Sequence, residues 1–231
     1  YTLPAQKRCY SLSSSIHRKQ QGYRIIAEIK FASPSLGSIR PAENPVAIAR
    51  DFAAAGAAAL SILTEPVYFH GDTAFIPAIR PHVEIPLLRK DFIIDERQIA
   101  ESCALGADAV LLIAGVLGNR LGEMVDLALA YGLEPLVEVH SAQEVKKVLS
   151  TNARLAGINN RDLRTMRTDL STTMRLAPSL RQAGVTVISE SGVIWPYDVR
   201  VLRPFADAFL VGTSIMGAMN PVQRLEGLVR A

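Results

Sequence analysis

The sequence has few of the features that mark exported, membrane-embedded or disordered proteins. Its 231 residues include only two cysteines, Cys9 and Cys103, which form no CxxC pair and no disulfide framework. No apolar stretch approaches the ~20 residues that span a bilayer, and the first residues lack a signal-peptide pattern. Charged residues make up 20% of the chain against 49% hydrophobic ones, which excludes disorder. We therefore expect a folded, cytoplasmic protein with no membrane partner.

Runs of like charge and linker-like segments are also missing. The formal net charge is +3, and lysine and arginine are interspersed with acidic residues. We therefore expect no nucleic-acid partner, whereas an anionic small ligand fits this charge. Because no linker divides the chain, we expect a single domain over residues 1–231, and by default a monomer.

What the sequence does contain is a repeated short apolar run, rich in β-branched residues, that stops at a polar or glycine-bearing end. Eight such runs occur: IIAEIK, ALSILTE, IPLLRKD, AVLLIA, PLVEVH, LAGINNRD, VTVISESG and AFLVGTS. Helical punctuation lies between them. Asn44 precedes a proline at the first helical position, Gly106 and Gly132 follow two other helices, and Ser141 with Glu144 predicts a capping box.

Strands that alternate with helices pair in parallel, and parallel strands are buried on both faces, which explains the nearly continuous apolar runs. Eight units of about 29 residues favour an α/β fold of the closed (β/α)8 type, a TIM barrel. An open doubly wound sheet is the alternative. Residues 1–24 form an N-terminal extension, in which residues 11–20 predict a helix that caps the barrel.

In such a barrel the active site lies at the carboxyl ends of the strands. The odd-numbered runs end near one level with charged side chains, namely Glu28, Lys30, Lys90, Glu138 and Glu190. Burying charges costs several kcal/mol per ion unless they pair, so a purely structural origin is disfavoured. The alternative is that some of these side chains point outward into ion pairs with the helices.

The last two runs end in small residues. Ser191 and Gly192 follow the seventh run, and Gly212 and Thr213 follow the eighth. Glycines let backbone amides approach an anion, and barrels commonly hold a phosphate at these two loops. We predict a phosphate site there, to which Ser33 contributes from the first loop. The alternative is that the glycines serve tight turns only.

The sixth run ends in a polar cluster. Arg161 is suited to a bidentate contact with a carboxylate, and Asn159 is suited to orient a hydroxyl group. The structural alternative is an ion pair of Arg161 with Asp162 or Glu190.

Several of these motifs match a known family. The chain resembles the indole-3-glycerol phosphate synthases in IIAEIKFASPS, LRKDFIID, DAVLLIA, LVEVH, GINNRDL, SESG and FLVGTSIM, which stand in family order from Arg24 to Met216. The resemblance implies a cofactor-free lyase of tryptophan biosynthesis. This enzyme closes the ring of 1-(2-carboxyphenylamino)-1-deoxyribulose 5-phosphate and releases carbon dioxide and water, giving indole-3-glycerol phosphate.

The resemblance also implies roles for individual residues. Lys90 is the acid that polarises the ketone, and Glu138 accepts or relays a proton in the dehydration. The implied catalytic set is Lys90, Glu138, Lys30, Glu28, Asn159 and Glu190, and the division of acid and base roles among its lysines and glutamates is left open. The implied phosphate site is Ser33, Gly192, Gly212 and Thr213, with Ser191 beside it. Arg161 fixes the local network, and the aryl ring lies in an apolar slot of Phe69, Phe92, Leu111 and Leu163.

Other activities are compatible with the same barrel. A sugar-phosphate isomerase, or an aldolase that forms a Schiff base through Lys90 or Lys30, is the first. A barrel that binds phosphate ligands without catalysis is the second, although Lys30, Lys90 and Glu138 are all present. Glu138 and His140 share a strand face as metal ligands would, but no third ligand has suitable spacing, so no metal site is predicted.

Overall fold

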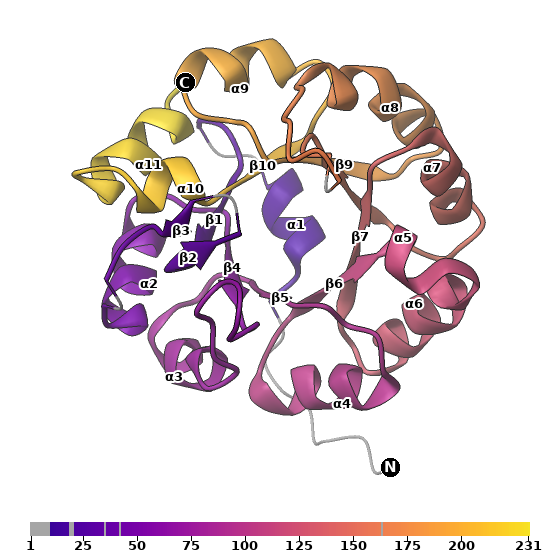
Figure 1. The fold of residues 1–231 in the computed structure, drawn as a ribbon, viewed down its shortest axis with the longest axis horizontal. Helices are drawn as coiled ribbons and strands as arrows, with labels where there is room; N and C mark the ends of the chain where they lie inside the picture. Colours follow the sequence, from indigo (N-terminus) through magenta and orange to yellow (C-terminus); the bar gives the residue numbers. More distant parts are fainter. Residues whose placement is uncertain (1–9, 19–20, 35, 42, 163) are drawn as a thin grey trace.

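The computed structural model describes residues 10–18, 21–34, 36–41, 43–162 and 164–231. Eight parallel strands close into a barrel in the order β1-β10-β9-β8-β7-β6-β5-β4, with helices around it (Figure 1). The strands are β1 (Ile25–Ile29), β4 (Ala59–Leu63), β5 (Leu87–Lys90), β6 (Ala109–Ile113), β7 (Glu134–Val139), β8 (Leu155–Asn159), β9 (Thr186–Glu190) and β10 (Ala208–Val211). Each strand overlaps one apolar run. The predicted TIM barrel is therefore confirmed, and the open-sheet alternative is wrong.

Helices return the chain from one strand to the next along the outside of the barrel. They are α2 (Pro45–Ala54), α3 (Phe75–Ile79), η1 (Arg80–His82), α4 (Glu96–Leu105), α5 (Ala114–Leu117), η2 (Gly118–Arg120), α6 (Leu121–Ala130), α7 (Ala142–Leu149), α8 (Ser171–Gln182), α9 (Pro196–Leu202), α10 (Thr213–Met216) and α11 (Pro221–Val229). A small antiparallel hairpin, β2 (Ala32–Ser33) and β3 (Gly37–Ser38), lies in the loop after β1. In the described part of the chain, no helix has both the length and the apolar character of a membrane span.

The helix boundaries follow from local capping. The backbone N–H of Val46 donates to the side chain of Asn44 at 2.9 Å, at the predicted start of α2. At α7, the N–H of Glu144 donates to Ser141 Oγ at 3.3 Å, as predicted. The Glu144 carboxylate, however, accepts the N–H of His140, which lies one residue before the cap. The capping interaction thereby ties the end of β7 to the start of α7.

Helix α1 (Leu12–His17) lies in the centre of the barrel when the molecule is viewed as in Figure 1. The backbone N–H of Leu12 donates to the carboxylate of Glu134 at the start of β7, and His17 Nε2 lies 2.8 Å from Thr186 Oγ1 at the start of β9. Leu12 and Ile16 are buried among side chains of the barrel interior. The predicted capping helix is therefore present over Leu12–His17, whereas residues 19 and 20 of the predicted range lie outside the described residues. It closes the amino ends of the strands and leaves their carboxyl ends open.

The strands are buried on both faces because helices cover the outside and side chains fill the inside. All five residues of β1, β4, β6, β8 and β9 are buried. The interior cluster includes Ile26, Leu88, Leu136 and Ile188, one residue each from β1, β5, β7 and β9. This apolar filling supports the charged side chains that end the same strands.

Candidate active site

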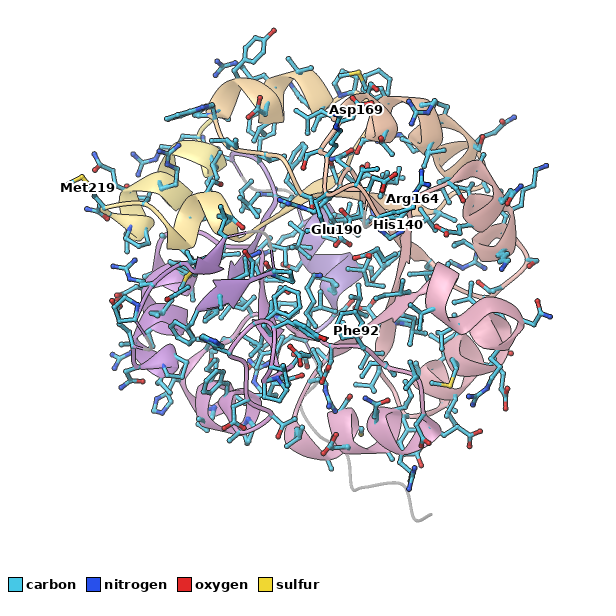
Figure 2. The ribbon with its side chains drawn as sticks, viewed as in Figure 1. Phe92, His140, Arg164, Asp169, Glu190 and Met219 are labelled. Atoms are coloured by element: carbon cyan, nitrogen blue, oxygen red, sulfur yellow. The ribbon has the colours of Figure 1, made fainter. Side chains whose placement is uncertain are left out.

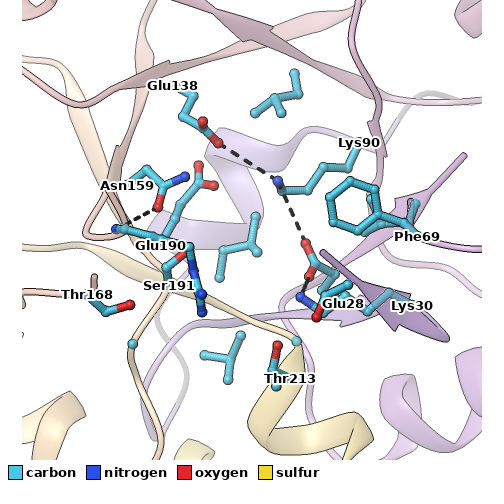
Figure 3. A pocket seen from close by; sticks show the side chains of 18 of the residues that line it. Glu28, Lys30, Phe69, Lys90, Glu138, Asn159, Thr168, Glu190, Ser191 and Thr213 are labelled. Atoms are coloured by element: carbon cyan, nitrogen blue, oxygen red, sulfur yellow. Dashed lines mark hydrogen bonds and ion pairs between the residues drawn. The ribbon is translucent and has the colours of Figure 1, made fainter. Parts of the chain in front are cut away.

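A cavity of about 550 Å³ opens at the carboxyl ends of the strands. Figure 3 shows charged and polar side chains that converge on it from several strands. All the site residues expected from the sequence line it, apart from Leu163, which lies outside the described residues: Glu28, Lys30, Ser33, Phe69, Lys90, Phe92, Leu111, Glu138, Asn159, Arg161, Glu190, Ser191, Gly192, Gly212 and Thr213. The barrel thus brings residues from distant parts of the sequence into one pocket.

Lys90 lies between two carboxylates at the centre of this pocket (Figure 3). Its Nζ is 3.8 Å from Glu138 Oε2 and 3.9 Å from Glu28 Oε2. Burial by itself lowers the pKa of Lys90, but Glu138, Glu28 and Glu190 outweigh it, and the pKa is raised. Lys90 therefore carries its proton at neutral pH.

A second ion pair joins the two charged residues that end the first apolar run. Lys30 Nζ lies 2.7 Å from Glu28 Oε1. Although burial raises the pKa of Glu28, the charges of Lys30 and Lys90 lower it by more, so Glu28 is ionised. The outward-pointing alternative is wrong for these residues, because Glu28 and Lys30 both line the pocket.

Glu190 differs from Glu28 and Glu138 because, in the described part of the chain, no cation lies within 4 Å of its carboxyl group. Its side chain is 1% exposed and lies near the barrel axis (Figure 2), beside Asn159 and Glu138 (Figure 3). Among the described residues no donor group reaches either carboxyl oxygen, and the carboxyl group of Glu138 is the neighbour with which Glu190 can share a proton. Burial, and then the charge of Glu138, raise the pKa of Glu190 well above its ordinary value, and Lys90 offsets this only in part. This shift favours the protonated form of Glu190.

The end of β8 is organised by its two asparagines. The N–H of Arg161 donates to Asn159 Oδ1 at 3.0 Å. Asn160 Nδ2 donates to the carbonyls of Glu190 and Ser191, each at 3.0 Å, and so fastens the ends of β8 and β9 together. Sequence reasoning missed this function of Asn160. Within the described ranges Arg161 forms no ion pair with Asp162 or Glu190, and its side chain is half-buried at the pocket.

The positions of Gly192, after β9, and Gly212, after β10, require glycine for two different structural reasons. Gly192 has a φ of +89°, and a Cβ there would lie 2.5 Å from Thr168 Cγ2. Gly212 has an ordinary φ of −119°, but a Cβ there would lie 2.3 Å from Glu28 Oε1. A tight turn thus explains Gly192 but not Gly212. Gly212 immediately precedes α10, which begins at Thr213.

Apolar side chains form the remaining walls of the pocket. The rings of Phe69 and Phe92 are tilted relative to each other, with centroids 6.5 Å apart, and Leu111 on β6 is buried. Leu170, Met166, Ile113 and Ile194 also line the cavity and were not expected from the sequence. Leu170 immediately precedes α8.

His140 lies at the edge of the site between two carboxylates. Its Nε2 is 3.4 Å from Glu138 Oε1, and its Nδ1 is 3.6 Å from Glu144 Oε2. Burial lowers the pKa of His140, but Glu144 and Glu138 outweigh it and raise the pKa. Among the residues that the structure describes, no three His, Cys, Asp or Glu side chains are grouped as metal ligands. The contacts of His140 are those of an ion-pairing residue.

Comparison with known proteins gives a consistent result. Residues 2–228 match the model of the family described as indole-3-glycerol phosphate synthase. Proteins of that name are 46% identical in Carboxydothermus hydrogenoformans (89% of this chain, 78% of the relative), 44% in Aquifex aeolicus (90% and 82%) and 42% in Methanopyrus kandleri (91% and 84%). A solved 3-hexulose-6-phosphate synthase has a TM-score of 0.67 at 16% identity, covering 89% of this chain and 97% of that one. At that identity the similarity concerns the fold alone.

Proposed function

The chain belongs to the indole-3-glycerol phosphate synthase family, and from this premise we propose that the cavity around Lys90 is where the reaction takes place. The protein is a carboxy-lyase of tryptophan biosynthesis that acts on a phosphorylated small molecule. One observation carries the assignment of the site. Lys90 is held between two buried carboxylates in a pocket with an apolar wall on one side and glycine-bearing strand ends on another.

The reaction has three steps with different chemical needs. The aromatic carbon that bears the carboxylate attacks the ketone carbon, and the ketone oxygen takes a proton to become a hydroxyl group. Loss of carbon dioxide leaves its bonding electron pair in the ring and restores aromaticity. The hydroxyl group then takes a second proton and leaves as water, and a base removes a proton from the neighbouring carbon to form the indole. The site must therefore supply an acid at this oxygen in both ring closure and dehydration, and a proton acceptor at the end.

Lys90 meets the first need. Its ammonium group is held in the cavity, and the flanking carboxylates keep it protonated. An ammonium group aimed at the ketone oxygen stabilises the negative charge that develops there and donates the proton. Glu138, 3.8 Å from Lys90, is placed to accept or relay the proton in the dehydration.

The other polar residues orient the substrate. The ion pair of Glu28 and Lys30 lies beside Lys90 and helps to hold the carboxylate and hydroxyl groups of the substrate. Asn159 and Glu190 bind polar substrate atoms, and Arg161 stabilises this network.

The two ends of the substrate occupy opposite parts of the pocket. The phosphate binds the small residues at the strand ends, namely Ser33, Gly192, Gly212 and Thr213, with Ser191 beside them. The aryl ring packs against the apolar residues Phe69, Phe92 and Leu111, and we also assign Leu163 to this group from the sequence. Fixing both ends holds the ring carbon near the ketone, which accelerates an intramolecular reaction.

A Schiff-base aldolase or an isomerase is the alternative chemistry for the same lysines. A lysine attacks a carbonyl only after it loses its proton, and the raised pKa of Lys90 opposes this. Borohydride should therefore leave the enzyme active in the presence of substrate. A lysine adduct detected by mass spectrometry would favour the aldolase.

We further propose that the enzyme is a cytoplasmic monomer. The sequence has only two cysteines, which form no CxxC pair and no disulfide framework. Light scattering coupled to size exclusion should give the mass of one chain, and a mass of two chains would contradict this.

The proposed function is tested by mixing the purified protein with 1-(2-carboxyphenylamino)-1-deoxyribulose 5-phosphate. Indole fluorescence should appear and grow in proportion to enzyme concentration. Folded protein that yields no fluorescent product would contradict the proposal.

A further inference from the structure

Gly157 in β8 occupies a position where any other residue would collide with an active-site side chain. It pairs with Glu138 on β7 and with Ile188 on β9. A Cβ at Gly157 would lie 1.8 Å from Glu190 Oε1 and 2.9 Å from Glu190 Cδ. The φ of Gly157 is not positive, so the backbone does not require glycine. The glycine is required for space alone, and the Glu190 carboxyl group fills that space.

The groups around this space do not balance in charge if all are ionised. Glu190 interacts electrostatically with Glu138 on β7, Glu28 on β1 and Lys90 on β5. Lys30 forms an ion pair with Glu28. Two ammonium groups thus accompany three buried carboxyl groups, and His140 adds a cation that lies between Glu138 and Glu144. Lys30 lies against Glu28, and Lys90 lies between Glu28 and Glu138. Among the described residues, Glu190 is therefore the one of these three carboxyl groups with no cation within 4 Å. A buried acid without a cation or hydrogen-bond donor is most stable in its neutral form.

We propose that Gly157 is a positioning residue, and that its missing side chain forms a recess that holds the Glu190 carboxyl group, in its neutral form, beside Glu138. The part of this proposal that concerns catalysis rests on the proposed function. A neutral carboxyl group donates a hydrogen bond, whereas a second carboxylate beside Glu138 would repel the carboxylate of the substrate. The recess thereby lets the site hold three carboxyl groups and still accept an anionic substrate.

Gly157→Ala tests the recess with little risk to the fold. The three atoms nearest to such a Cβ all belong to the Glu190 side chain, which can rotate away without moving the backbone. The matched control is Gly227→Ala in α11, where a Cβ would meet nothing within 4 Å. Both variants should show the circular dichroism of the wild type. Gly157→Ala should reduce kcat by about 100-fold, as expected for a misplaced active-site group, and Gly227→Ala should not.

A double-mutant cycle separates positioning from a general structural effect. In a Glu190→Ala background the recess is empty, so adding Gly157→Ala should reduce kcat no further. The alkaline limb of the kcat/KM profile should also move to lower pH in Gly157→Ala, because the displaced carboxyl group becomes more solvated. The proposal would be overturned if the kcat of the double variant fell by the product of the two single-variant losses. It would also be overturned if Gly157→Ala had the wild-type kcat and the wild-type pH dependence of kcat/KM.

Infrared spectroscopy provides a readout that does not depend on the reaction. At neutral pH the wild type should show the C=O band of a protonated carboxylic acid, which Glu190→Gln should remove and Gly157→Ala should weaken. If this band is found but no indole is formed, the proposed function fails and the recess stands. If indole is formed but the band is absent or unaffected by both substitutions, the recess proposal fails alone.

Discussion

Arg89 and Lys90 are adjacent on β5 and have different roles. Arg89 faces the helices, and its guanidinium group lies 2.7 Å from Glu101 and 3.1 Å from Asp91. Lys90 faces the barrel interior, between two carboxylates. Because successive side chains on a strand point to opposite faces, one pair of residues supplies both a structural cation and the proposed acid.

Removal of the Lys90 ammonium group should abolish most of the turnover. We expect Lys90→Ala to lower kcat by about 10²- to 10⁴-fold, the usual contribution of a general acid, and to keep the fold. Steady-state kinetics and circular dichroism measure the two effects. Lys147→Ala, on the exposed side of α7, is the matched control and should be fully active. A near-normal rate for Lys90→Ala would refute its role as acid.

Glu190 should make the stability of the protein depend on pH. Because its native pKa is raised, the native state keeps a proton that the unfolded state releases at pH values above the ordinary glutamate pKa of 4.5. The free energy of unfolding should therefore fall as pH rises from about 4.5 toward the raised value, by roughly 1.4 kcal/mol per unit of pKa shift. Urea titrations should show a smaller fall in Glu190→Gln. Parallel pH dependences in the two proteins would contradict the assignment.

These residues differ in how far the sequence reveals them. Lys90, Glu138 and Glu190 could be predicted because each ends an apolar run, and the barrel brings all such ends together. The role of Gly157 could not be predicted, because it depends on the path of a side chain from the neighbouring strand. The same is true of Asn160, whose partners at the end of β9 lie 29 to 31 residues away in sequence.

Helix α1 acts at the end of the barrel opposite the pocket. Its start is held by hydrogen bonds from the backbone of Leu12 and the side chain of Ser11 to the carboxylate of Glu134. Leu12 and Ile16 cover the interior side chains. The sequence predicted a helix over residues 11–20. Its partners Glu134 and Thr186 are more than 100 positions away in sequence, so the place where the helix packs could not be predicted.

Leu12→Ala should therefore reduce stability without impairing catalysis. Leu12 is fully buried, and truncation of such a leucine costs about 2–5 kcal/mol in the free energy of unfolding. Denaturant titration measures this loss, and kcat and KM should keep their wild-type values. Leu129→Ala in α6 is the matched control, since Leu129 is 42% exposed and should contribute far less. A large rise in KM for Leu12→Ala would show that α1 shapes the pocket.

Closure of the barrel joins the first strand to the last. β1 pairs with β10 through Ile25 and Phe209 and with β4 through Ile29 and Ile62, so Glu28 and Gly212 become neighbours although they are distant in sequence. The eightfold repeat predicted this closure. The carboxylates and lysines then share one pocket as a consequence of topology, with the glycine-bearing ends beside them.

The most informative measurement follows carbon dioxide and indole fluorescence together while the wild-type enzyme consumes 1-(2-carboxyphenylamino)-1-deoxyribulose 5-phosphate. If one pocket carries out ring closure, decarboxylation and dehydration, the two products should appear in equal amounts, and both should be lost in Lys90→Ala. Carbon dioxide without indole, or equal yields that persist in Lys90→Ala, would contradict a ring closure driven by Lys90.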